Sequence, residues 1–159
     1  MSTRHPDDEP ITAEGLKALK HELGDLETRG RREMARRILR ARELGDLSEN
    51  AEYHAAKEDQ AHLETQIKRL KQRLRNAVVV ETEAQAEVFA FGRTAEVLDE
   101  GSGEVHRWRI VGATEADLSA GKLSAQSPVA RALLDRAPGE LVEVPTPRGP
   151  RRLRIQRLL

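Results

Sequence analysis

The spacing of apolar residues in the first half of the chain constrains the fold more than any other feature. Leucines recur at intervals of three and four residues over 16–26, and apolar residues recur with a heptad register over 56–77. This spacing predicts two amphipathic helices that pack against each other. The segment between them is too short for any arrangement except an antiparallel hairpin. Abundant charge and few aromatic residues also favour an elongated molecule over one large core.

The heptad register of the first helix is interrupted near Gly30. A strict heptad would place Arg37 and Arg40 against the second helix, whereas a four-residue stutter places Ile38 and Ala41 there. We therefore predict a stutter, because it keeps apolar residues in the seam.

The chain changes character after residue 80, where helical spacing gives way to short strand-like segments. We predict an α+β protein with a disordered leader at 1–11, a coiled-coil hairpin at 12–80 that begins with Thr12 as N-cap, and a globular domain at 81–159. A short helix should begin at Ser127 and Pro128. Strands are expected at Phe89–Phe91, Thr94–Leu98, Arg107–Val111, Glu140–Val144 and Arg152–Ile155.

A net charge of zero conceals a strong segregation of charge along the predicted hairpin. Acidic residues surround the turn at 43, 46, 49, 52, 58 and 59, while arginines crowd the end of the first helix between 29 and 42. Further lysines and arginines crowd the end of the second helix, from 68 to 75. The hairpin should therefore present an acidic tip on a basic shaft.

Interhelical ion pairs can account for part of this pattern. In a hairpin that turns near residue 47, residues face each other when their numbers sum to the mid-nineties. This rule places Arg36 and Arg37 opposite two acidic residues of the second helix. It also places Arg29 and Arg32 near Glu64, and Lys68 and Lys71 near Glu22, Asp25 and Glu27.

A stripe of like charge fits this explanation less well. Arg32, Arg36 and Arg40 follow one another at four-residue spacing. Each such pair costs roughly 0.2–0.5 kcal/mol unless something neutralises it. The sequence leaves two roles open for the stripe, which can complete interhelical ion pairs or bind a polyanion.

Four motifs together resemble those of a known family. They are GDLSENAEYHAAKE at 45–58, GxxxLxxELxxL at 15–26, SxxSPVARALL at 124–134 and RIVGxxEAD at 109–117. In this order they resemble the bacterial Gre transcript cleavage factors, GreA type. The resemblance extends over almost the whole chain from Ile11 onward.

The resemblance implies a transcription elongation factor that acts on RNA polymerase. Such a factor inserts its coiled-coil tip into the secondary channel and docks a globular domain of FKBP-like fold on the channel rim. It stimulates the polymerase to cleave backtracked nascent RNA near the RNA 3′ end, and it is not a stand-alone enzyme. The alternative is a non-cleaving channel regulator, because inhibitory homologues occupy the same channel with altered tips. We expect a cytoplasmic monomer that has no cofactor of its own.

The tip chemistry follows from two carboxylates. Cleavage of a phosphodiester needs an activated water and neutralised charge, which a pair of Mg²⁺ ions can supply. Mg²⁺ is usually bound by one or two protein carboxylates. By resemblance, Asp46 and Glu49 are the functional acidic pair. We assign Asp46 to the second Mg²⁺ of the polymerase active site, directly or through its waters, and Glu49 to orienting or deprotonating the attacking water.

The same two residues also fit a structural pattern. Asp46 as N-cap and Glu49 at the third helical position would form a capping box for the second helix. The two roles can hold in turn if the cap orders the loop until the polymerase is engaged.

The remaining candidates have structural alternatives. Asn50 can stabilise the turn, and Tyr53 can pack in the seam. Ser127 and Pro128 are assigned to polymerase docking, although they can equally cap a helix whose apolar residues fill the core. Contacts with RNA or polymerase are assigned to Arg36, Arg37, Arg40, Asn50 and Tyr53.

Other protein classes fit poorly. The absence of cysteine excludes disulfides and thiolate chemistry, and the histidines show no metal-ligand spacing. Without a signal peptide or a long apolar run, we expect a soluble protein that contacts no membrane. A self-sufficient nuclease would need more ligands than two acids on a turn, and a prolyl isomerase would need an aromatic-lined pocket. A DNA-binding zipper would extend its basic region beyond a parallel coil.

Overall fold

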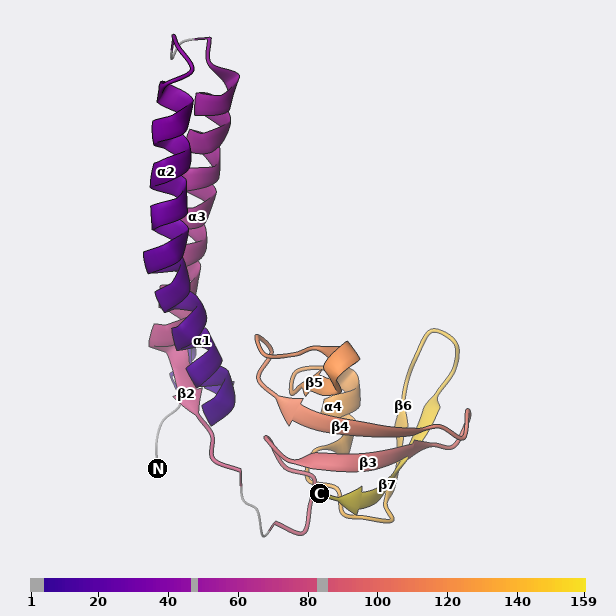
Figure 1. Cartoon of the computed structure of the whole chain (residues 1–159). Helices are drawn as coiled ribbons and strands as arrows, with labels where there is room; N and C mark the ends of the chain where they lie inside the picture. Colours follow the sequence, from indigo (N-terminus) through magenta and orange to yellow (C-terminus); the bar gives the residue numbers. More distant parts are fainter. Residues whose placement is uncertain (1–4, 47–48, 83–85) are drawn as a thin grey trace. The chain divides into compact units, whose positions relative to one another are not determined.

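The computed structural model describes residues 5–46, 49–82 and 86–159 (Figure 1). It divides into two compact units. One unit is a helical hairpin, Leu16–Ala77, and the other joins the N-terminal segment up to Gly15 to Val78–Leu159. The fold is α+β, as predicted. Within the described ranges, no helix is long and apolar enough to cross a membrane.

Two antiparallel helical arms lie side by side in the hairpin unit (Figure 1). Thr12 caps the first arm as expected, because its hydroxyl accepts a hydrogen bond from the Gly15 N–H at 3.0 Å. The arms consist of α1 (Ala13–Asp25), a π-helical turn η1 (Leu26–Gly30) and α2 (Arg31–Arg42), followed after the turn by α3 (Ala51–Asn76).

The π-turn η1 is the structural form of the predicted stutter. A π-turn holds an extra residue, so the apolar face of the helix shifts relative to that of a regular helix. Ile38 and Ala41 are consequently buried, with 8% and 5% of their surface exposed, whereas Arg40 is exposed. Gly30 lies in the seam, where a Cβ would meet Leu63 at 3.4 Å.

Interhelical ion pairs confirm the predicted register of the hairpin. Arg37 of α2 pairs with Asp59 of α3, and Lys71 lies 3.7 Å from the Glu27 carboxylate. All four side chains are substantially exposed, so the pairs indicate the register more than they contribute stability.

The partner of Glu64 differs from the one predicted. Arg31, and not Arg29 or Arg32, donates from Nε and Nη2 to the two carboxylate oxygens at 2.9 and 3.1 Å. These bonds lower the pKa of the Glu64 carboxyl. Arg29 turns instead to Asp25, one turn back, at 2.7 Å. Arg31 satisfies the same register rule, because residues 31 and 64 also sum to the mid-nineties, so only the choice among neighbouring arginines differs.

The second unit is built on a five-stranded sheet in the order β5-β4-β3-β7-β6. All neighbouring strands are antiparallel except β4 and β5. Short connections that contain glycine join β3 to β4 and β6 to β7. The elements are β3 (Thr94–Asp99), β4 (Val105–Val111), η2 (Leu118–Ala120), β5 (Lys122–Ser124), α4 (Pro128–Leu133), β6 (Leu141–Val144) and β7 (Arg151–Leu158).

The core lies between one face of this sheet and α4. Strand β3 alternates, with Ala95 and Val97 fully buried and their neighbours on the open face. Trp108 belongs to this core and has 8% of its surface exposed. Ala130 and Leu133 of α4 complete the core from the other side.

In the segment 109–117, the Glu115 carboxylate has a structural role. Glu115 accepts hydrogen bonds from the backbone N–H groups of Thr12 at 3.0 Å and Gly112 at 2.9 Å, and from the Thr12 hydroxyl. Asp117 caps the short helix η2 by accepting the Ser119 N–H. The motif therefore holds the N-terminal segment against the sheet.

The predicted disordered leader is wrong for residues 9–11. They form strand β1 (Glu9–Ile11), which pairs with β2 (Ala77–Val79) in a two-stranded sheet. Ile11 is 3% exposed, and its carbonyl accepts the Val80 N–H at 2.9 Å. The partner strand is distant in sequence, so local composition could not indicate this pairing.

Two further elements differ from the prediction. Phe89–Phe91 is a loop, although Phe89 is fully buried and its N–H donates to the Arg136 carbonyl at 2.8 Å. The apolar residues of this segment therefore reflect the burial of Phe89 in a loop and do not indicate a strand. Strand β5 was missed because only Leu123 among its three residues is apolar and buried.

Candidate functional site

The acidic tip lies where α2 gives way to α3 at the end of the hairpin (Figure 1). Gly45 has φ +124°, a conformation that side chains rarely adopt, and it turns the chain after α2. Asp46 and Glu49 lie on either side of Leu47 and Ser48, which fall outside the described residues. Both acidic residues are exposed. The fold thus brings the two predicted acids to one exposed turn.

Asn50 is the N-cap of α3. Its side-chain oxygen accepts the Tyr53 N–H at 3.1 Å, and its Nδ2 donates to the Ala41 carbonyl at 2.5 Å. The proposed capping box is therefore wrong, because Asn50 holds the cap position that it assigned to Asp46 and because Glu49 precedes the helix. Asn50 instead ties the end of α2 to the start of α3.

Neither Asp46 nor Glu49 at the tip is therefore the N-cap residue of α3. Within the described residues, no hydrogen bond or ion pair involves the Glu49 side chain. No group of three His, Asp or Glu side chains in the described ranges could hold a metal ion. Exposed carboxylates on a turn match the one or two oxygen ligands that proteins usually give Mg²⁺. Two exposed carboxylates at one turn can therefore supply oxygen ligands to a divalent cation.

The arginine stripe and its neighbour Arg37 differ in their partners. Arg37 is committed to Asp59, whereas Arg32, Arg36 and Arg40 are exposed and form no ion pair within the described residues. The pairing expected for Arg36 is therefore not formed. Three guanidinium groups along α2 remain available to an anion.

A shallow depression of about 330 Å³ lies beside this stripe. Leu44 at its edge is 70% exposed. The depression places arginine donors beside apolar surface close to the tip. It is lined by Arg37, Arg40, Ala41, Leu44 and Glu52.

Tyr53 is half-buried at the start of α3 and is not a full member of the seam. The Arg42 guanidinium carbon lies 5.9 Å from its ring centre, and the His54 ring meets it edge-on at 5.8 Å. These neighbours hold the ring near the tip, where part of it stays accessible.

Ser127 and Pro128 have different surroundings. The Ser127 hydroxyl accepts the Ala130 N–H at 3.1 Å and donates to the Ser124 carbonyl at 2.8 Å, so it acts as the N-cap of α4. Pro128 is exposed at the first helical position. The cap therefore fixes the loop that presents Pro128.

Replacing Asn50 with alanine should destabilise the hairpin. Loss of an N-cap costs about 0.5–2 kcal/mol, and here the bond to Ala41 is lost as well. Thermal unfolding followed by circular dichroism should show a lower transition for the helical signal. Asn50→Asp is the matched control, since it keeps the cap acceptor and loses only the donor to Ala41. Equal stability of Asn50→Ala and the unmodified chain would contradict the cap assignment.

Two family models together match most of this chain. Residues 9–79 match the family model for the N-terminal part of a transcription elongation factor, and residues 84–158 match the GreA/GreB C-terminal model. The chain is 46% identical over 141 residues to transcription elongation factor GreA of Phenylobacterium zucineum, covering 88% of this chain and 90% of that one. It is 44% identical over 149 residues to GreA of Alkalilimnicola ehrlichii, covering 92% and 94%. The crystal structure of GreA factor homolog 1 of Thermus thermophilus is 28% identical, covering 96% and 99%, with a TM-score of 0.42.

Proposed function

Because this chain belongs to the GreA/GreB family of transcription elongation factors, we propose that it stimulates RNA polymerase to cleave backtracked nascent RNA. The hairpin tip would enter the secondary channel and reach the RNA 3′ end in the polymerase active site. The main support is the position of Asp46 and Glu49, both exposed at the end of an antiparallel helical hairpin. The chain would act in the cytoplasm as a monomeric accessory factor, with the polymerase as the enzyme.

The proposed mechanism assigns each acid a task. The two Mg²⁺ ions of the polymerase, when bound, activate water and neutralise charge on the attacking and leaving oxygens. Asp46 would hold the second ion, directly or through its waters. Glu49 would orient the attacking water or accept its proton. Asn50 and Gly45 would maintain the shape of the turn that carries both acids.

A role in RNA contact is proposed for the arginine stripe. Arg36 and Arg40 lie on α2 close to the tip, and neither has a carboxylate partner in the described residues. Guanidinium groups in this state can bind phosphate bidentately. Arg37 would contribute less, because Asp59 already occupies it.

Arg36→Ala combined with Arg40→Ala should weaken contact with the extruded RNA. For single strands, each lost phosphate contact lowers the slope of log affinity against log salt by about 0.7. The salt dependence of stimulated cleavage should therefore flatten, and crosslinking to the RNA should fall. Arg31→Ala is the matched control, since it removes an arginine of α2 that is occupied by Glu64. Unchanged crosslinking together with lost helical stability would favour a purely structural stripe.

Docking on the channel rim is proposed for the loop before α4. Pro128 is exposed there, while the Ser127 cap holds the loop in shape. Rim docking would supply most of the affinity and leave the tip free for chemistry.

A cleavage assay on a stalled elongation complex tests the proposal directly. Addition of the protein should shorten the nascent RNA from its 3′ end, and the chain alone should leave free RNA intact. Binding to the polymerase with inhibition and without cleavage would instead identify a non-cleaving channel regulator.

A further inference from the structure

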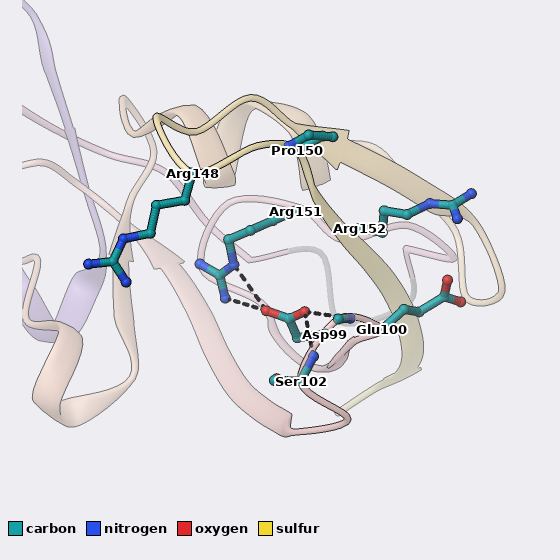
Figure 2. Close-up of a pocket in the computed structure, with 8 residues that line it drawn as sticks. Asp99, Glu100, Ser102, Arg148, Pro150, Arg151 and Arg152 are labelled. Carbon is teal, nitrogen blue, oxygen red and sulfur yellow. Dashed lines mark hydrogen bonds and ion pairs between the residues drawn. The ribbon is translucent and has the colours of Figure 1, made fainter.

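The two β-hairpins of the sheet unit meet at one end of the sheet. Strands β3 and β7 are antiparallel neighbours, so the turn after β3 lies beside the loop before β7. Between them is an open depression of about 740 Å³ (Figure 2). Its lining includes Asp99 and the turn that follows it, together with Arg148, Arg151 and Arg152.

The Asp99 carboxylate in this depression is engaged by an arginine and by backbone N–H groups. The Asp99 carboxylate accepts hydrogen bonds from Arg151 at 3.0 and 2.9 Å and from the Gly101 N–H at 2.9 Å. Burial raises the pKa of Asp99, but Arg151 and the backbone N–H groups of Gly101 and Ser102 outweigh it and lower the pKa below its usual value. The Arg151 guanidinium carbon also lies 5.9 Å from the centre of the Trp108 ring. Asp99 therefore serves to fix Arg151.

The second acid of the depression is also occupied. Glu100 pairs with Arg154 at 2.9 Å, and further along the same strands Glu96 pairs with Arg157 at 2.9 Å. These cross-strand pairs neutralise much of the basic character that the sequence of β7 suggests.

Two arginines of the depression keep unused donors. Arg148 forms no ion pair or side-chain hydrogen bond in the described residues, and Gly149 at φ +108° with the Thr146 hydroxyl shapes the turn that carries it. Arg152 lies 3.6 Å from Glu143, and both side chains are more than half exposed. Such a surface pair holds a guanidinium weakly. Figure 2 shows Arg148 and Arg152 extending away from the Asp99 carboxylate.

We propose that this depression binds phosphates of a nucleic acid backbone without sequence preference. Arginines position nucleic acids through phosphate contacts that need no apolar anchor. Protein partners, in contrast, are usually held by buried aromatic or aliphatic anchors. Pro150 is the main apolar lining residue, and Trp108 is 8% exposed beneath Arg151. The depression therefore offers arginine donors but no large apolar side chain that could anchor a protein, and this favours phosphate as the ligand.

The depression is separate from the proposed docking loop. Ser124 of β5 pairs with Val111 at the end of β4, beside the start of β3, and α4 follows from there. The depression lies where β3 finishes, at the opposite end of the sheet. Both surfaces can therefore be occupied at once.

The test is binding of a fluorescent 20-base-pair duplex of arbitrary sequence to the full chain at several salt concentrations. The background variant Arg36→Ala with Arg40→Ala removes the hairpin stripe from the measurement. Adding Arg148→Ala with Arg152→Ala should reduce affinity and lower the salt slope by about 1.8, since each contact with duplex DNA contributes about 0.9. Arg136→Ala, an exposed arginine outside the depression, is the matched control and should change neither value.

Three results would overturn this proposal. One is an unchanged salt slope in the Arg148 and Arg152 variant, with the fold verified by circular dichroism. Another is an equal loss of affinity on Arg136→Ala, which would indicate a diffuse charge effect. The third is tighter binding of a poly-glutamate peptide than of the duplex, lost on the same substitutions, which would assign the depression to an acidic protein. Arg148→Lys combined with Arg152→Lys should retain most of the salt slope, because both substitutions preserve the positive charge.

Discussion

Asp46→Asn and Glu49→Gln should each reduce stimulated RNA cleavage by about ten-fold or more, while binding to RNA polymerase stays nearly unchanged. The reason is that an interaction made in the transition state raises the rate without adding ground-state affinity. Both substitutions are close to isosteric, and neither residue is the cap of α3. The measurement is single-turnover cleavage at saturating protein, with affinity measured separately.

The controls for this prediction lie on the same tip. Glu52→Gln removes an exposed negative charge from the first turn of α3 and should leave cleavage nearly unaffected. If Asp46 recruits the second ion, extra Mg²⁺ should partly rescue Asp46→Asn and should not rescue Glu49→Gln. Cleavage at the unmodified rate in both variants would refute the assignment of the two acids.

The hairpin could be predicted from sequence because its determinants are periodic. Apolar spacing indicated both helices, and the requirement for apolar residues in the seam indicated the stutter that the structure resolves as η1. The partner of Glu64 could not be predicted, because Arg29, Arg31 and Arg32 all lie near it by residue number and the register alone does not select among them. Arg31 therefore took the place expected for Arg29 and Arg32.

The capping of α3 shows where local patterns become ambiguous. Asp46 and Glu49 fit a capping box, yet Asn50 fits the N-cap equally well by residue type. The second bond of Asn50, to the Ala41 carbonyl, favours it, and that bond depends on how α2 and α3 approach each other. Tertiary geometry thus decided between two acceptable caps, and Asn50 rather than Asp46 is the N-cap of α3.

In the sheet unit, a strand whose buried and exposed residues alternate could be predicted from sequence. A short strand whose partner lies far along the chain could not. Strand β3 has alternate buried residues and was expected, whereas β1 and β5 have only three residues each. Strand β1 depends on a partner far along the chain, and β5 has a single buried apolar residue. The charge of β7 likewise depends on partners that are distant in sequence. Its arginines look like a basic surface in sequence, but Glu96, Glu100 and Asp99 on the neighbouring strand and turn neutralise three of them.

Separating the two parts of the chain should separate chemistry from docking. A fragment ending near Val80 keeps both helical arms and the β1–β2 pair, so it should still stimulate cleavage, but only at much higher concentration. Docking makes delivery of the tip effectively intramolecular, and tethering of this kind typically contributes a factor of about 10²–10⁴. Titration of the fragment in the cleavage assay measures that factor.

The complementary fragment, 84–159, should fold, compete with the full-length protein for polymerase and cleave nothing. Its expected folding rests on the core, since every residue of the buried cluster lies between Phe89 and Ile155. The two fragments mixed together should not recover full potency, because the connection between docking and tip is missing. If the hairpin fragment matched the full-length protein, or the folded sheet fragment failed to compete, docking would have to lie along the helices. The arginines of α2 would then be the first residues to test, because they would have to supply affinity as well as RNA contact.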